Sequence, residues 1–100
     1  MVRITVKRTD HIESMEIKGH AGSDVYGHDL VCAIVSGIAT GLANAVYEML
    51  HEEDIELREG YVSIRIHQPS GRSDDIMNTA LIMLKTAEEA NKDFLRISEV

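Results

Sequence analysis

Residues 30–47 read LVCAIVSGIATGLANAVY, a run without a charged side chain. Apolar residues in and just after this run recur at helical spacing, at Val31, Ile34, Val35, Ile38, Leu42, Ala45, Val46 and Met49. The run is as long as a short membrane span, but Ser36, Thr40 and Asn44 interrupt it, and its flanks lack the Lys and Arg bias that orients such spans. We therefore expect no membrane span, and instead a helix over about 29–51 that is buried against a sheet.

The segments on both sides of this helix alternate between apolar and polar residues, which is typical of strands with one buried face. In the first segment, Val2, Ile4 and Val6 fall on one face. Glu59 and Gly60 separate two such segments and indicate a hairpin turn. The pattern predicts strands over about 2–8, 12–19, 54–58, 61–67 and 94–100.

A second helix is predicted over about 74–92, with Ser73 as its N-cap. Asp74 and Asp75 lie in its first turn, where carboxylates complement the positive end of the helix dipole. The order of elements is then ββαββαβ. Because most strands have one apolar and one polar face, we expect both helices on one face of the sheet. The predicted fold is an α/β (α+β) two-layer sandwich with a mixed sheet of about five strands.

Composition limits the function. A chain of 100 residues is expected to form a single domain over 1–100, and one cysteine allows no internal disulfide. With 17 acidic and 10 basic side chains, the net charge of -7 argues against direct nucleic-acid binding, because phosphates require clustered Lys and Arg. An acidic surface favours basic partners. The amino-terminal residues resemble a strand and not a signal peptide, so a cytoplasmic location is expected.

The candidate constellation for chemistry is His20, Asp29, Cys32 and Ser36. Cys32 falls in the first turn of the predicted helix, where unpaired backbone amides favour a thiolate. His20 ends the second strand at the edge of the sheet where this helix begins, so its imidazole is within reach as a general base. Asp29 and Ser36 lie one turn before and one turn after Cys32. The residues alone also allow Cys32 to be a small buried hydrophobe and His20 a polar residue at a strand end.

Three segments carry a resemblance to a known family: KGHAG at 18–22, YG at 26–27 and DLVCAIVS at 29–36. They are similar to the signature of the ribosomal-processing cysteine protease family, called Prp. In that family, a Gly-His-Ala-Gly segment precedes an Asp-x-Val-Cys-Ala-Ala-Val-Ser segment at this spacing. Ile34 departs from the pattern, because it stands where alanine is common. The chain length and the order of predicted elements also agree with the family.

The resemblance implies a Cys–His dyad in which Cys32 is the nucleophile and His20 the base, with Asp29 and Ser36 in support. It also implies the substrate, the N-terminal extension of a large-subunit ribosomal protein, removed after aromatic residues. Ribosomal proteins are basic, so an acidic protease would attract this substrate. In such a reaction the backbone amides at the start of the helix would stabilise the oxyanion.

The resemblance further implies a homodimer and a mobile loop over the site. Here the loop would cover residues 21–28 and include Gly22, Tyr26 and Gly27. No cofactor is expected.

Two other interpretations compete with a protease. A metal site could draw on His20, His28, Asp29 and Cys32, but their spacing matches no zinc pattern with two ligand pairs, so no metal is expected. A non-enzymatic module could dock on a ribosomal protein or an assembly factor through the polar face of the sheet. Thiol reactivity separates this module from a protease, because a buried structural cysteine stays inert until the protein unfolds.

Overall fold

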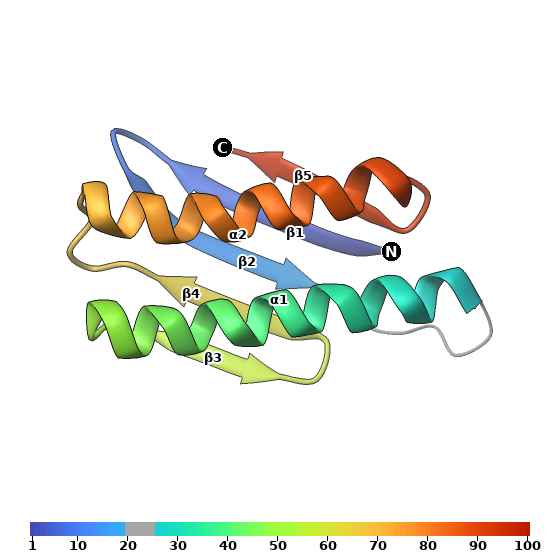
Figure 1. Ribbon diagram of the computed structural model, residues 1–100, viewed down its shortest axis with the longest axis horizontal. Helices are drawn as coiled ribbons and strands as arrows, with labels where there is room; N and C mark the ends of the chain where they lie inside the picture. Colours follow the sequence, from blue (N-terminus) through green and yellow to red (C-terminus); the bar gives the residue numbers. More distant parts are fainter. Residues whose placement is uncertain (20–25) are drawn as a thin grey trace.

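A computed structural model of the chain describes residues 1–19 and 26–100, and for residues 26–29 it describes the backbone only. Five strands form one sheet in the order β3-β4-β2-β1-β5, and two helices cover one of its faces (Figure 1). The elements are β1 (Val2–Arg8), β2 (Ile12–Lys18), α1 (Tyr26–Leu50), β3 (Ile55–Arg58), β4 (Tyr61–Arg65), α2 (Gly71–Ala90) and β5 (Leu95–Glu99). This two-layer architecture with the order ββαββαβ confirms the predicted fold class.

The sheet is mixed. β1 pairs antiparallel with β2 and parallel with β5, while β4 pairs antiparallel with both β2 and β3. Each strand begins within one residue of its predicted start and ends within two residues of its predicted end. The alternation of apolar and polar residues was therefore enough to place all five strands.

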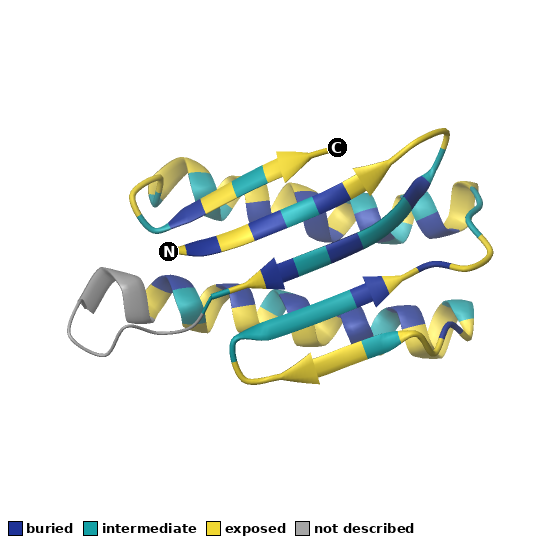
Figure 2. Cartoon of the chain, turned by 180° about the vertical axis from the view of Figure 1, so that it is seen from behind, coloured by how far each residue is buried: buried dark blue, intermediate teal, exposed yellow. Residues whose placement is uncertain are grey.

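The core lies between the sheet and the two helices. From the strands it takes the predicted Val2, Ile4 and Val6, together with Met15, Ile17 and Ile64, which are all at most 4% exposed. Ile12 and Leu95, at 0% exposed, join them without having been predicted as core residues. The helices contribute Val31, Val35, Leu42, Val46, Met77, Leu81 and Leu84. Burial of each large apolar side chain stabilises the fold by about 1.5–3 kcal/mol. The opposite face of the sheet is uncovered, as Figure 2 shows from behind.

By length and composition alone, residues Leu30–Leu50 of α1 are apolar enough to cross a membrane, and 33% of the apolar window is buried inside the protein. In the fold, Val31, Val35 and Val46 of this helix are buried in the shared core, as predicted for a helix packed on a sheet.

Both helices begin earlier than predicted. α1 begins at Tyr26 instead of about 29, so Tyr26 and Gly27 are its first two residues and not part of a loop. One glycine costs a helix only about 1 kcal/mol relative to alanine, which the hydrogen bonds of the following turns offset. α2 begins at Gly71, and its N-cap is Ser70, not Ser73.

The hydrogen bonds at the start of α2 explain why its N-cap is Ser70 and not Ser73. Ser70 has an extended backbone, and its side chain accepts a hydrogen bond from the Ser73 amide at 3.1 Å. The Ser73 hydroxyl in turn accepts from the Ser70 amide at 2.8 Å. In this reciprocal capping box Ser73 is the third helical residue and Ser70 is the N-cap. The sequence pattern alone did not show which of the two serines is the N-cap.

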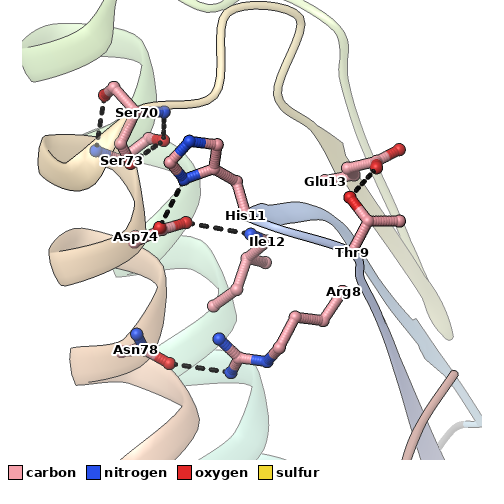
Figure 3. A network of polar contacts seen from close by, with 9 residues as sticks. All are labelled: Arg8, Thr9, His11, Ile12, Glu13, Ser70, Ser73, Asp74 and Asn78. Carbon is pink, nitrogen blue, oxygen red and sulfur yellow. Dashed lines mark hydrogen bonds and ion pairs between the residues drawn. The ribbon is translucent and has the colours of Figure 1, made fainter.

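The first turn of α2 is fastened to the turn between β1 and β2 (Figure 3). Asp74 accepts a hydrogen bond from the Ile12 amide through Oδ1 at 2.9 Å, and its Oδ2 lies 2.6 Å from Nδ1 of His11. The hydrogen bond with His11, followed by that from the Ile12 amide, lowers the pKa of Asp74 below its ordinary value. The carboxylate therefore links a helix to the β1–β2 turn as well as complementing the helix dipole.

Gly19 follows β2 with a φ of +118°, a conformation that only glycine adopts readily. Its amide donates to the Gly60 carbonyl at 3.0 Å, which ties the end of β2 to the β3–β4 hairpin. A Cβ added at Gly19 would lie 2.5 Å from the carbonyl oxygen of Met1. The chain can therefore leave β2 in this direction only with glycine at this position.

We expect Asp74→Asn to lower the free energy of unfolding near neutral pH. A depressed folded pKa gives stability that is present above the unfolded value of about 3.9 and is lost as pH falls through the folded pKa. The difference between wild type and Asp74→Asn should therefore shrink on acidification. Urea unfolding across pH 3 to 7 measures it, with the exposed neighbour Asp75→Asn as control. A difference that does not change with pH would contradict this assignment.

We expect Gly19→Ala to destabilise the protein by about 1–3 kcal/mol, because alanine would be strained at a positive φ and would contact the Met1 carbonyl. Gly71→Ala is the matched control, because nothing lies within 4 Å of the added Cβ there. It should change stability by no more than about 0.5 kcal/mol. Thermal and urea unfolding measure both variants, and equal effects would show that Gly19 is not constrained.

Candidate active site

An open cleft of about 550 Å³ lies between the first half of α1 and the β3–β4 hairpin. α1 contributes Cys32 and Ser36 to its lining, and the hairpin contributes residues 57–62. Gly19, at the end of β2, lines the same cleft. The lining thus combines a thiol, a hydroxyl and backbone groups at one end of the sheet.

Cys32 and Ser36 share one face of α1, as their spacing of one helical turn predicts. Cys32 is partly exposed and Ser36 is exposed, whereas Val31 and Val35, the residues just before them, are 1% and 3% exposed. Cys32 packs against the core without being enclosed by it. Its place on the cleft wall leaves the residue partly exposed, in contrast to the interpretation of Cys32 as a small buried hydrophobe.

The helix start corrects one argument for a reactive thiol. Since α1 begins at Tyr26, Cys32 is in its second turn and not in its first. The unpaired amides of a helix are those of its first four residues, here 26–29, and the effect of the dipole falls off within the first turn. The prediction that helix-start amides surround Cys32, and would stabilise a thiolate or an oxyanion there, is therefore wrong for this helix.

The structure describes the remaining predicted site residues only in part. His20 and Gly22 lie outside the described residues. Asp29 is in the first turn of α1, three residues before Cys32, but its side chain is not described. Of the predicted constellation, the structure therefore brings Cys32 and Ser36 together in the cleft, next to Gly19, the residue before His20.

The β3–β4 hairpin is the part of the site that sequence reasoning missed. Its turn was predicted, and Gly60 has the positive φ of +74° that such a turn requires. Its position opposite α1 was not predicted, because strand order across a sheet is not visible in a local pattern. The Arg58 guanidinium lies 4.4 Å from the centre of the Tyr61 ring, and the Tyr61 hydroxyl donates to Glu16 at 2.9 Å. The first contact lies within the hairpin, and the second fastens the hairpin to β2.

Among the side chains that the structure describes, no group of three or more His, Cys, Asp or Glu residues is placed to hold a metal ion. Of the four residues considered for a metal site in the sequence analysis, only Cys32 has a side chain that the structure describes. Among the described residues that line the cleft, the candidate nucleophiles are the thiol of Cys32 and the hydroxyl of Ser36.

Comparison with known proteins assigns the chain to a family. Residues 1–96 match the family model described as "Cysteine protease Prp". The ribosomal processing cysteine protease Prp of Staphylococcus aureus is 31% identical, over 97% of this chain and 95% of the relative. The protein of the same name from Bacillus subtilis is 32% identical, over 98% of this chain and 96% of the relative.

Solved structures agree with this assignment. The S. aureus protease Prp with a covalently linked product peptide superposes with a TM-score of 0.86 at 28% identity, covering 100% of both chains. The SMU.848 protein of Streptococcus mutans superposes with a TM-score of 0.78 at 27% identity, covering 100% of this chain and 96% of that one. With one cysteine in the chain, partly exposed on the wall of a cleft, and a match over nearly its whole length, this protein belongs to the Prp family of cysteine proteases.

Proposed function

We propose that this protein is an endopeptidase that removes the N-terminal extension from a large-subunit ribosomal protein, with Cys32 as nucleophile and His20 as base. The observation that carries the proposal is the partly exposed Cys32 on the wall of the cleft. The similar S. aureus protease was solved with a substrate peptide and with a covalently linked product peptide, which supports a peptide as the ligand. The relatives are named ribosomal processing proteases, which supports a ribosomal precursor as the substrate.

The reaction is acyl transfer in two steps. The Cys32 thiolate attacks the scissile carbonyl carbon, and the C–N bond breaks as His20 gives its proton to the leaving amine. Water then attacks the thioester, loses a proton to His20, and releases the carboxylate and the thiol. His20 directly follows Gly19, which lines the cleft, and consecutive Cα atoms are about 3.8 Å apart, which supports its role beside Cys32.

Two further residues support the dyad in this proposal. Ser36 lines the cleft one turn after Cys32, where its hydroxyl can hydrogen-bond to the substrate. Asp29 is assigned to orienting His20, because a carboxylate next to the thiolate itself would raise the pKa of the thiol.

The excess of acidic over basic residues in the chain supports a basic substrate, since attraction between opposite charges speeds the association of enzyme and substrate. A ribosomal precursor is met in the cytoplasm, so we place the protein there.

The family resemblance also leads us to propose a homodimer, and the outer face of the two helices supports it. A groove of about 520 Å³ between α1 and α2 is lined mainly by apolar side chains, among them Ile38, Met49 and Met83. Met49 and Met83 are 47% and 52% exposed. A Cβ at Gly37 or Gly41 would meet nothing within 4 Å, so the backbone there is open to a helix of a second copy. Exposed apolar patches of this kind are typical of protein interfaces.

We expect Cys32→Ala to abolish cleavage of a peptide that carries the ribosomal extension, with a loss of more than about 10³-fold, because the nucleophile is removed. Ser36→Ala, one turn away in the same cleft, should retain activity within about tenfold. Liquid chromatography of the products measures both variants. Equal cleavage by wild type and Cys32→Ala would remove Cys32 as nucleophile. Alkylation that occurs only on unfolding would favour the binding module instead.

For the dimer, we expect a molar mass near twice 11.1 kDa by light scattering after size exclusion. Met49→Glu with Met83→Glu should give the monomer, because each places a charge in the apolar groove. Val100→Glu is the matched control, since Val100 is exposed and apolar but lies outside the lining of the groove. A wild-type monomer at tens of micromolar, or a dimer unaffected by the methionine changes, would contradict the proposed interface.

A further inference from the structure

The uncovered face of the sheet is basic, although the chain is acidic. Successive side chains of a strand point to opposite faces, so the residues between the buried ones face outward, toward the viewer in Figure 2. Six of the 10 Lys and Arg residues occupy such positions, and all six are exposed: Arg3, Lys7, Lys18, Arg58, Arg65 and Arg96. The acidic residues of the same strands that pair with these cations are Glu13, 3.8 Å from Lys7, Glu16, 3.3 Å from Lys18, and Glu56, 2.9 Å from Arg58.

Four of these cations form a row across all five strands. Arg96 of β5 is the register partner of Arg3 in β1, and Arg3 is the partner of Lys18 in β2. Lys18 pairs with Tyr61 in β4, and Tyr61 pairs with Arg58 in β3. We call these five residues the basic row. It contains one aromatic residue and no acidic one, and it crosses the end of the sheet where Arg58 and Tyr61 also line the catalytic cleft.

The row is electrostatically unfavourable in the isolated protein. Like charges directly opposite each other on neighbouring strands are destabilising, and Lys18, Arg3 and Arg96 are three in succession. Glu16 reduces the repulsion at Lys18, because the Oε1 atom of Glu16 lies 3.3 Å from the Nζ atom of Lys18. Within residues 1–19 and 26–100, Arg3 and Arg96 make no ion pair. An anionic ligand on this face would remove the repulsion and supply the missing partners.

The other end of the row offers a different contact. Tyr61 is partly exposed, and its hydroxyl is held by Glu16 at 2.9 Å. The Arg58 guanidinium stacks on its ring, and Glu56 holds the same guanidinium at 2.9 Å. A cationic track that includes a held aromatic ring is the arrangement with which proteins bind single-stranded nucleic acid, through phosphate contacts and base stacking.

We propose that the basic row binds the phosphate backbone of single-stranded RNA. Neighbouring strands are about 4.8 Å apart, so the four steps of the row span about 19 Å, enough for a short run of phosphates. Guanidinium groups match phosphate oxygens in geometry, and three of the four cations are arginines. This face is uncovered, and an unpaired strand, unlike a duplex, has bases that are free to stack on an aromatic side chain such as Tyr61. The acidic remainder of the chain restricts RNA to this face.

This binding is independent of proteolysis and goes beyond the proposed function. A precursor that is still bound to RNA would meet the protease next to its cleft, since the row adjoins it through Arg58 and Tyr61. With two to four phosphate contacts, binding is expected to be weak and strongly salt-dependent, with a slope of log K against log salt of about -1.5 to -3.

Fluorescence anisotropy with a labelled 12-nucleotide oligouridylate at low salt tests the proposal. Arg3→Glu with Arg96→Glu should weaken binding at least tenfold and make the salt slope shallower by about 1.4, the loss of two contacts at about 0.7 each. The matched control is Arg72→Glu with Lys92→Glu. It makes the same change in net charge at two exposed residues outside the sheet and should alter binding less than threefold. Thermal unfolding verifies that all the variants are folded.

Three outcomes would overturn the proposal. Wild-type protein that binds no oligouridylate at low salt would do so directly. Equal weakening by the two double variants would show an effect of net charge alone and not of the row. Binding of an oligoglutamate of equal length as tightly as the RNA would assign the row to an acidic protein segment instead.

Discussion

The one-sided burial of β1 is the constraint on which the rest of this structure depends. Val2, Ile4 and Val6 are at most 2% exposed, between β2 and β5 and beneath the helices. Because side chains alternate along a strand, burying these three fixes Arg3 and Lys7 on the opposite face. A register slip of one residue would move the charges into the core, so the register is strongly specified. The core and the basic face follow from the same alternation.

The end of the central strand β2 then positions the site. β2 ends at Gly19, whose positive φ and close approach to Met1 set the direction in which the chain leaves the sheet. α1 returns across the covered face, and the hairpin at residues 57–62 lies opposite its first half. Cys32 is accessible because it lies on the side of α1 that faces this cleft, while Val31 and Val35 point into the core. The proposed nucleophile and these core residues thus lie on different faces of one helix.

Charge is distributed by the fold and not by the composition. The net charge of -7 predicts an acidic surface with basic partners, and for the long-range encounter with the proposed basic substrate this average is the relevant quantity. At contact distance the local arrangement matters instead, because exposed charges are screened over about 8–10 Å at physiological salt. Two opposite electrostatic preferences can therefore coexist on one small protein, with acidic residues elsewhere on the surface and cations on the open sheet face.

The sequence by itself determined the strands, the fold class and the family. Period-two alternation and the uncharged run at 30–47 are local patterns, and local patterns determine which face of an element is buried. It also identified Cys32 and Ser36 as neighbours, since one helical turn separates them. The tertiary structure decided where α1 begins, which serine caps α2, and that the hairpin forms a cleft wall. It also decided that four cations from four strands lie in one row. These features depend on strand order and register, which join residues far apart in sequence and leave no local pattern to detect.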